Sequence, residues 1–378
     1  MTEQAETANP TEPPHHEVLT QIRGQVGLIT LNRPKALNAL SLGMIRTLTR
    51  CLLDWRDDPQ IKAVAIRGTH KQGDFGGFCA GGDIRFFHKA ALAGEATLED
   101  FFTEEYALNH LIHTYPKPYI AFMDGIVMGG GMGISQGASL RIVTQATKMA
   151  MPETHIGLFP DVGGGYFLSR CPGRVGEFLA LTGELLGAGA ALSYGLADQC
   201  FDADQLALAW EALTDLDWHQ PDSLTQWCAI YSIAPVAHCT GASAQINHFF
   251  SLPDMTAMVQ ALEADSSDWA QQCAATLRKR SPLMLHVTLM QIRKAHTLSL
   301  ADDLRMERDM VRHCFHPDHL RRSGLQSETV EGIRALAVDK DHAPKWEPQR
   351  IEDVTPAMVA PFFQSPWPVH AHPLRHLR

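Results

Sequence analysis

Residues 117–137, KPYIAFMDGIVMGGGMGISQG, contain the strand-to-helix transition on which the fold class rests. The segment at 117–125 is typical of a strand, and the glycines after it indicate a tight turn before a helix. A helix that begins directly after such a turn leaves its first backbone N–H groups unpaired. A strand, a glycine turn and a helix in this order are typical of an α/β protein.

The segments on both sides continue the alternation of strands and helices. The expected elements are a hairpin at 18–33, a helix over 40–55 with Ser41 as its cap and Asp58-Pro59 as its stop, a strand at 61–68, helices near 83–92 and 98–115, and a strand at 140–152. Their order predicts an α/β fold with βαβ crossovers.

Beyond about residue 181 the strand patterns fade. The later expected helices lie near 204–215, 255–279, 283–298 and 300–315. The first seventeen residues contain four Glu, three Pro and no Lys or Arg, a composition typical of a disordered tail and unlike a targeting peptide. We therefore expect a disordered tail at 1–17, an α/β core at 18–200 and a helical C-terminal region at 201–378.

The composition is that of a globular protein. The chain has 378 residues, of which 45% are hydrophobic and 20% charged, enough for a large core. Its net charge of -10 argues against a broad nucleic-acid surface, which needs clustered Lys and Arg. No run of about 18 apolar residues occurs, so no membrane span is expected. The eight cysteines are widely spaced without a CxxC pair, which predicts reduced thiols and a cytoplasmic location.

Two glycine clusters, FCAGGD at 78–83 and MGGGMG at 128–133, precede expected helices. Glycine lets a ligand approach the backbone closely, and two N–H groups directed at one oxygen would form an oxyanion hole. Two other interpretations stay open: both clusters could be only tight turns, or the second could bind a dinucleotide, with Glu153 as the distal acid. The spacing from Gly133 to Gly137 is one residue too long for the dinucleotide fingerprint, which disfavours the last interpretation.

Four segments together are more specific than either cluster alone. They are LNRPKALNAL (31–40), FCAGGDI (78–84), DGIVMGGGMG (124–133) and MPETHIGLFPDVGG (151–164). In this order they closely resemble the crotonase (enoyl-CoA hydratase/isomerase) superfamily. The resemblance implies a core of repeated ββα units, a CoA thioester ligand and an oxyanion hole that polarises the thioester carbonyl. The implied donors are the backbone N–H groups of Gly82 and Gly130.

The acidic residues depart from the hydratases of this superfamily, which use two glutamates to add water across a double bond. Glu153 matches one of them, but Gly133 stands in place of the other and cannot transfer a proton. Asp161 occupies a position where hydratases usually have glycine. This combination resembles the 3-hydroxyisobutyryl-CoA hydrolase branch. Three further segments resemble the same branch: FFTEEYALNHLI (101–112), FPDVGGGYFLSR (159–170) and VEGIRALAVDKDHAPKWEP (330–348).

Glu153 and Asp161 are therefore the implied catalytic pair. Gly157 and Pro160 prevent a continuous helix here, so the turn itself must bring the two acids together. In an apolar pocket, burial and mutual repulsion would raise at least one pKa, which suits acid–base chemistry near neutral pH. The residues alone also allow two solvated turn carboxylates, with Asp161 capping a helix that begins near Val162.

Further residues are implied around the substrate. Only one of the adjacent acids Glu104 and Glu105 can face inward, and the resemblance implies Glu105, placed to hold a 3-hydroxyl group. CoA carries several phosphates, so cations are expected nearby. The candidates are Arg33, Lys35, Arg334, Lys340 and Lys345, with backbone contacts from Ala36 and Leu37 implied at the adenine end.

The first functional hypothesis is hydrolysis of a short branched 3-hydroxyacyl-CoA, in particular 3-hydroxyisobutyryl-CoA of valine catabolism. Glu153 would act as nucleophile or as general base, and the sequence does not choose between these roles. One alternative is an enoyl-CoA hydratase/isomerase in which Asp161 replaces the missing acid; another is a non-catalytic member that binds acyl-CoA or a macromolecule.

The resemblance implies no metal or redox cofactor, and CoA is part of the substrate. The histidine-rich stretch HCFHPDH at 313–319 fits no standard zinc spacing and is interpreted as a surface cluster. A homo-oligomer is possible because the superfamily commonly forms trimers.

Overall fold

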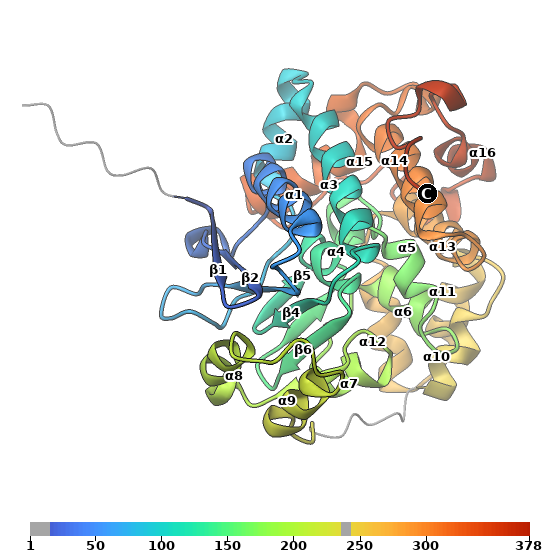
Figure 1. Cartoon of the computed structure of the whole chain (residues 1–378). Helices are drawn as coiled ribbons and strands as arrows, with labels where there is room; N and C mark the ends of the chain where they lie inside the picture. The colour runs from blue at the N-terminus through green and yellow to red at the C-terminus, as the bar shows by residue number, and fades with distance from the viewer. Residues whose placement is uncertain (1–15, 236–242) are drawn as a thin grey trace, which may run out of the picture.

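The computed structural model describes residues 16–235 and 243–378 (Figure 1). Within these ranges the main sheet has six strands in the order β1-β2-β3-β4-β6-β8. The first two form an antiparallel hairpin and the other neighbours are parallel, as expected for an α/β fold. The strands are β1 (Val18–Arg23), β2 (Val26–Leu31), β3 (Ala63–Gly68), β4 (Tyr119–Met123), β6 (Leu140–Thr144) and β8 (Gln199–Phe201). Residues 1–15 of the expected N-terminal tail lie outside the described residues.

Both faces of the main sheet are covered, because successive side chains of a strand point to opposite sides. On β2, Val26 and Leu28 belong to an apolar cluster with α8 (Leu206–Leu213) and α9 (Ser223–Tyr231). Ile29 and Leu31 belong to the larger cluster with α1 (Leu42–Asp57). The expected cap of α1 is confirmed, since the Ser41 hydroxyl accepts a hydrogen bond from the N–H of Met44.

The expected single strand at 140–152 is wrong. The chain turns at 145–147, after β6, and continues as β7 (Lys148–Ala150), which pairs with β5 (Ile126–Met128) in a separate small sheet. The turn is stabilised by the Thr147 hydroxyl, which accepts from the N–H of Thr144 and donates to the carbonyl of Met123. The small sheet carries the second glycine cluster, which leads into α4 (Gly130–Gln136).

The other helices divide between the core and the C-terminal region. They are α2 (Ile84–Ala93), α3 (Thr97–His113), α5 (Gly164–Leu168), α6 (Val175–Thr182), α7 (Ala188–Ser193), α10 (Ser243–Phe250), α11 (Met255–Ala264), α12 (Asp268–Leu277), α13 (Pro282–Ala295), α14 (Leu300–Phe315), α15 (Glu328–Ile333) and α16 (Pro356–Val359). The expected helix at 255–279 is two helices, because Ser267 caps the start of the second. The helical C-terminal region is confirmed.

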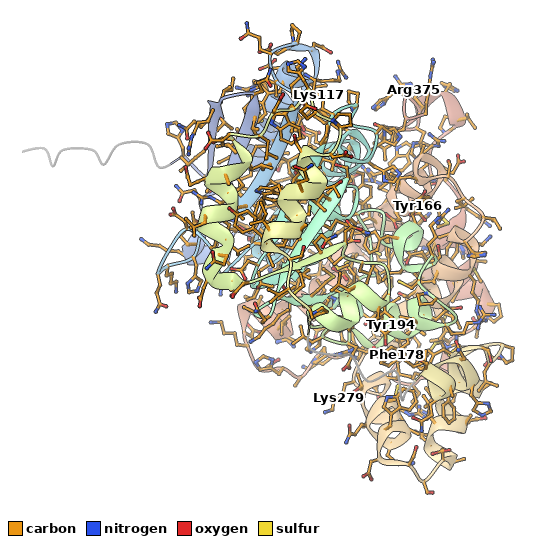
Figure 2. The ribbon with its side chains drawn as sticks, turned by 60° about the horizontal axis from the view of Figure 1, so that its bottom comes forward. Lys117, Tyr166, Phe178, Tyr194, Lys279 and Arg375 are labelled. Carbon is orange, nitrogen blue, oxygen red and sulfur yellow. The ribbon has the colours of Figure 1, made fainter. Side chains whose placement is uncertain are left out.

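This C-terminal region packs directly on the core (Figure 1). Helix α13 contacts α5 and α6, α14 contacts α3 and α5, and α15 contacts α2. Figure 2 shows Phe178 of α6 at the junction with the later helices, where its ring lies 5.4 Å from that of Phe250 and 5.9 Å from that of Trp269. The region therefore forms part of the surroundings of α3 and α5, which flank the site described next.

Candidate active site

A cavity of about 210 Å³ lies where the two glycine clusters, α3 and the turn at 151–162 meet. Three carboxylic acids, Glu105, Glu153 and Asp161, line it. The rest of its wall is mostly apolar, including Ile84, Phe87, Ile156, Leu158, Val162 and Leu336. Leu336 belongs to the C-terminal region, so that region completes the cavity.

Gly82 and Gly130 bring two backbone segments together at this cavity. A Cβ atom placed on Gly130 would lie 3.3 Å from the amide nitrogen of Gly82. Gly130 is the first residue of α4, where the N–H group has no partner within the helix. The N–H of Gly82 has no acceptor within residues 16–235 and 243–378. Two unused donors at one cavity are the arrangement that an oxyanion hole requires.

Cys79, beside this first glycine cluster, is buried, and burial raises the pKa of its thiol to about 12. A thiol that stays protonated at neutral pH is not a nucleophile. Cys79 is a packing residue of the loop.

Glu105 is the inward acid of α3, and its neighbour Glu104 faces solvent, where it pairs with Arg46 at 2.6 Å. Glu105 is 2% exposed, and its Oε1 atom has no hydrogen-bond partner in the described part of the chain. The same oxygen would lie only 2.6 Å from a Cβ atom on Gly130, so the glycine makes room for it. Burial, followed by the charges of Asp161 and Glu153, raises the pKa of Glu105 well above that of an ordinary glutamate.

Glu153 begins a short 3-10 helix, Glu153–Ile156, that ends at Gly157 in the left-handed conformation. Its carboxyl group is buried, and its Oε2 atom has no partner within the described residues. Burial, and then the nearby charge of Asp161, raises the pKa of Glu153 well above the ordinary value. The turn therefore brings the two acids together, and the alternative of two solvated carboxylates is wrong.

Asp161 is buried and accepts a 2.7 Å hydrogen bond from the hydroxyl of Tyr106. Burial raises the pKa of Asp161 to about 6, while the Tyr106 hydrogen bond opposes the rise. Sequence reasoning missed Tyr106, although it follows Glu105 directly in the segment quoted above. A tyrosine on a buried helix must find a partner for its hydroxyl, and that requirement was the available signal.

Position 133 has no room for a side chain. A Cβ atom on Gly133 would lie 2.6 Å from the Cβ of Val162 and 2.9 Å from the Nδ2 of Asn109. Val162 has φ of 57°, a conformation that is rare for a β-branched residue and places it against Gly133. The space in which a second glutamate would have to begin is therefore filled by the residue after Asp161.

Asp161 does not cap the following helix, and that alternative is also wrong. Helix α5 begins at Gly164 rather than near Val162, and its N-cap residue is Gly163. The carboxyl groups of Glu307 and Asp303 on α14 accept from the first N–H groups instead. Sequence reasoning missed both acids; their spacing of four residues among apolar positions of one helix was a signal for an inward-facing pair.

The predicted phosphate partners differ in how their charges are used. Arg33 pairs with Glu17 and Asp83, and Arg334 pairs with three carboxylates, those of Glu331, Asp339 and Asp341. The other three cations, Lys35, Lys340 and Lys345, form no ion pair within the described ranges. Leu37 is exposed and adopts a left-handed conformation after the short helix Pro34–Ala36, which places this loop at the surface.

Larger hollows lie elsewhere on the molecule. One of about 730 Å³ is lined by α11, α13 and residues 354–359, and one of about 710 Å³ lies near Arg174 and His296. Neither is lined by a group of buried acids. Within residues 16–235 and 243–378, no three His, Cys, Asp or Glu side chains are arranged to hold a metal, and no helix is long and apolar enough to cross a membrane. The three-acid cavity is therefore the candidate active site.

The chain is similar to known proteins in both sequence and structure. Residues 26–363 match the enoyl-CoA hydratase/isomerase family. The chain is 38% identical to the mitochondrial 3-hydroxyisobutyryl-CoA hydrolases of Xenopus tropicalis and Rattus norvegicus, over 92% of this chain and 89% of each relative. It is also similar to a crystal structure of a carnitinyl-CoA dehydratase from Mycobacterium thermoresistibile, with 37% identity, a TM-score of 0.85, and 96% of this chain and 99% of that chain covered.

The expected cytoplasmic location is contradicted by these comparisons, because the curated animal relatives are named as mitochondrial. The expectation rested on the cysteines, and the seven within the described residues are indeed free thiols. A reduced thiol indicates a reducing environment without saying which compartment supplies it. Cysteine usage therefore could not make this distinction.

Proposed function

Because this chain belongs to the enoyl-CoA hydratase/isomerase family, we propose that it hydrolyses 3-hydroxyisobutyryl-CoA to 3-hydroxyisobutyrate and CoA. The observation that carries the proposal is the position of the second acid of the cavity. Val162 fills the space at position 133, where a hydratase would carry its second glutamate, and the buried carboxyl of Asp161 lines the cavity beside Glu153 instead. The relatives named as hydrolases of this substrate, at 38% identity over most of both chains, support the same choice.

In the proposed reaction the thioester oxygen lies between the N–H groups of Gly82 and Gly130. The Glu153 carboxylate attacks the carbonyl carbon, the C–S bond breaks, and Asp161 gives a proton to the departing CoA thiolate. Water then opens the mixed anhydride and returns a proton to Asp161. In the alternative route Glu153 takes a proton from a water molecule that attacks the same carbon directly. Both routes need an ionised Glu153 and two donors for the oxyanion.

The other proposed contacts with the substrate use side chains that have no hydrogen-bond or ion-pair partner in the described residues. We propose that Glu105 holds the 3-hydroxyl group, because its Oε1 is buried in the cavity without a partner. We propose that the phosphates of CoA use Lys35, Lys340 and Lys345, while the carboxylate pairs of Arg33 and Arg334 hold their own loops in place. Backbone groups at Ala36 and Leu37 would contact the adenine end. This chemistry uses no metal or redox cofactor, and we propose that activity survives treatment with EDTA.

A second candidate, hydration or dehydration of an enoyl-CoA, is favoured by one observation, the similar structure of a carnitinyl-CoA dehydratase. The two reactions separate in one assay. Purified protein is incubated with 3-hydroxyisobutyryl-CoA and with crotonyl-CoA, following free thiol and the enoyl absorbance separately. Thiol release that is lost in both Glu153→Gln and Asp161→Asn supports hydrolysis. Loss of enoyl absorbance without thiol release contradicts it, and intact binding with neither signal indicates a non-catalytic member.

The route of hydrolysis is tested with isotopically labelled water. In a single turnover, label in the Glu153 carboxyl group indicates the anhydride, because water opens it partly at the enzyme carbon. Label in the product acid is common to both routes, because water can also open the anhydride at the substrate carbon, so only label in Glu153 is diagnostic of the anhydride.

A further inference from the structure

The turn that carries Asp161 is held by two acids of α14 in the C-terminal region. Glu307 accepts hydrogen bonds from the N–H groups of Gly163, at 2.7 Å, and Gly165, at 2.9 Å. Asp303 accepts from the N–H of Tyr166 at 2.9 Å. Figure 2 shows Tyr166 on α5, beside the C-terminal helices. All three N–H groups lie within five residues of Asp161 in the sequence.

Both acids are fully buried, which makes their presence unusual. Glu307 and Asp303 are each 0% exposed and lie four residues, about one helical turn, apart on α14. Burial raises the pKa of Asp303 to about 7 and raises that of Glu307 as well. Two neighbouring carboxyl groups in an apolar interior each disfavour ionisation of the other. Three N–H donors reach Glu307 and one reaches Asp303, so the hydrogen bonds stabilise the ionised form of Glu307 more than that of Asp303.

The same network fixes the residues on both sides of Asp161. Gln291 of α13 donates to the carbonyl of Pro160 at 2.6 Å and to Glu307 at 3.1 Å. The N–H of Gly164 donates to the carbonyl of Asp161 itself at 2.7 Å. A Cβ atom on Gly165 would lie 2.4 Å from the Oδ1 of Asp303, so this glycine is needed for the acids to reach the backbone. Residues 160–166 are thus tied to α13 and α14 on either side of the acid.

Helix α14 also holds the helix on the other side of the cavity. Arg308 is 1% exposed and bonds to Glu99 and Thr103 of α3, and Arg312 bonds to Glu99 as well. Helix α3 carries Glu105 and the Tyr106 hydroxyl that bonds to Asp161. Helix α14 therefore contacts both the turn that carries Asp161 and helix α3, which carries the Tyr106 hydroxyl bonded to Asp161.

We propose that Glu307, with Asp303 as its proton-sharing neighbour, is a positioning residue that holds Asp161 in place for catalysis. The proposal rests on the proposed function, because it assigns Glu307 to the hydrolysis step. The proposal predicts that substitutions of Glu307 and Asp303 have different effects. Asn at 303 still offers an oxygen to Tyr166 and an N–H to Glu307, like a protonated Asp. Gln at 307 presents one neutral oxygen to two N–H groups and loses the charge.

The test compares Glu307→Gln and Asp303→Asn, each a change of one atom, with Glu177→Gln as the control. Glu177 is a buried acid of α6 that pairs with Arg174. We expect Glu307→Gln to lower kcat for 3-hydroxyisobutyryl-CoA about 100-fold, since a small misplacement of a catalytic group has that effect. KM should change less than about threefold, because ground-state binding is preserved. The decrease in kcat caused by Asp303→Asn should be at least about tenfold smaller than that caused by Glu307→Gln. The kcat of Glu177→Gln should equal that of the wild type.

A second readout does not depend on activity. Amide hydrogen exchange of the peptide spanning residues 159–168 should become faster in Glu307→Gln and stay near the wild-type rate in Asp303→Asn. Unchanged exchange in Glu307→Gln overturns the proposal. So does a wild-type kcat in that variant, or an equal effect of the two substitutions. If the wild-type chain releases no thiol, the proposed function fails, and the exchange experiment still decides whether Glu307 holds the turn.

Glu307→Gln could also fail to fold. Gln291→Met then replaces it, because the volume is kept and only the donor between Pro160 and Glu307 is lost. A lower kcat with unchanged KM is expected, and a wild-type kcat overturns the proposal.

Discussion

At the scale of single residues, position 133 shows how the absence of a side chain makes room for a neighbouring segment of the cavity. Gly133 is in contact distance of Val162, and Val162 follows the acid that lines the cavity. The unusual φ of Val162 is maintained because the residues around it are tied down on both sides. The glycine at 133 and the packing of Val162 after Asp161 therefore depend on one another.

Gly133→Ala should lower the free energy of unfolding by about 1–3 kcal/mol, the usual cost of overpacking a filled core. The added Cβ would meet Val162 at 2.6 Å, where the backbone leaves little freedom to move. Urea unfolding measures the loss. Gly187→Ala is the control, because a Cβ there meets no atom within 4 Å. Equal stability of the two variants would mean that the space at 133 is open.

Tyr106→Phe should raise the pKa of Asp161 above its value of about 6, because the hydroxyl bond favours the ionised form. We expect kcat/KM to fall about tenfold, the lower end of what a hydrogen bond to a charged group contributes. The pH profile of kcat/KM should show the limb assigned to Asp161 at higher pH. Tyr115→Phe, which removes a hydroxyl bonded to the Leu52 carbonyl, should leave the profile in place. A profile unaffected by Tyr106→Phe would separate this tyrosine from catalysis.

At the scale of elements, α3 directs two adjacent acids to different surroundings, because consecutive side chains of a helix point in different directions. Glu104 pairs with Arg46 at the surface, while Glu105 enters the cavity. The 3-10 helix Glu153–Ile156 ends at Gly157 in the left-handed conformation, and the segment after it brings Asp161 to the same cavity as Glu153. Each acid thus comes from a different kind of local structure.

Glu105→Ala should reduce the preference for the hydroxylated substrate. We expect kcat/KM for 3-hydroxyisobutyryl-CoA to fall about 10- to 100-fold more than that for isobutyryl-CoA, which lacks the hydroxyl. The ratio of the two values is the measurement. Glu104→Ala should leave the ratio unchanged, since its carboxyl lies at the surface. An equal fall for both substrates would assign Glu105 to the thioester rather than to the hydroxyl.

At the scale of the whole molecule, the C-terminal region is part of the site rather than an attachment to it. It supplies Leu336 to the cavity wall, and α14 contacts both α3 and α5. It also buries acids of its own. Glu328 of α15 accepts from Ser281 and from the N–H of Glu347, and burial raises its pKa to about 7.

This carboxyl makes stability depend on pH. The pKa of Glu328 is about 7 in the folded chain and about 4.5 when unfolded, so the folded state holds the extra proton between these values. The contribution of Glu328 to the free energy of unfolding should therefore decrease from pH 5 to pH 8, by about 3 kcal/mol at most. Urea unfolding of the wild type and of Glu328→Gln at both pH values measures it. A wild-type decrease that Glu328→Gln does not reduce would exclude this carboxyl as the source.

The limits of sequence reasoning are visible in particular residues. Local patterns identified the hairpin, the cap of α1 and the helical C-terminal region, because periodicity and capping act over a few residues. The same patterns wrongly predicted one strand at 140–152 in place of β6 and β7, because the turn at 145–147 contains no glycine or proline. The split depends on which sheet each half can pair with, and that is a long-range property.

The candidate site divides in the same way. The residue types at 133, 153 and 161 are fixed in the sequence, and with the motifs around them they indicated the family and the class of reaction before any contact was known. Tertiary structure alone placed Tyr106 on Asp161, closed position 133 with Val162, and brought Asp303 and Glu307 to the turn across about 140 residues of chain. The reason is physical: a motif specifies which groups can react, whereas burial, spacing and shared protons arise only when distant segments pack together.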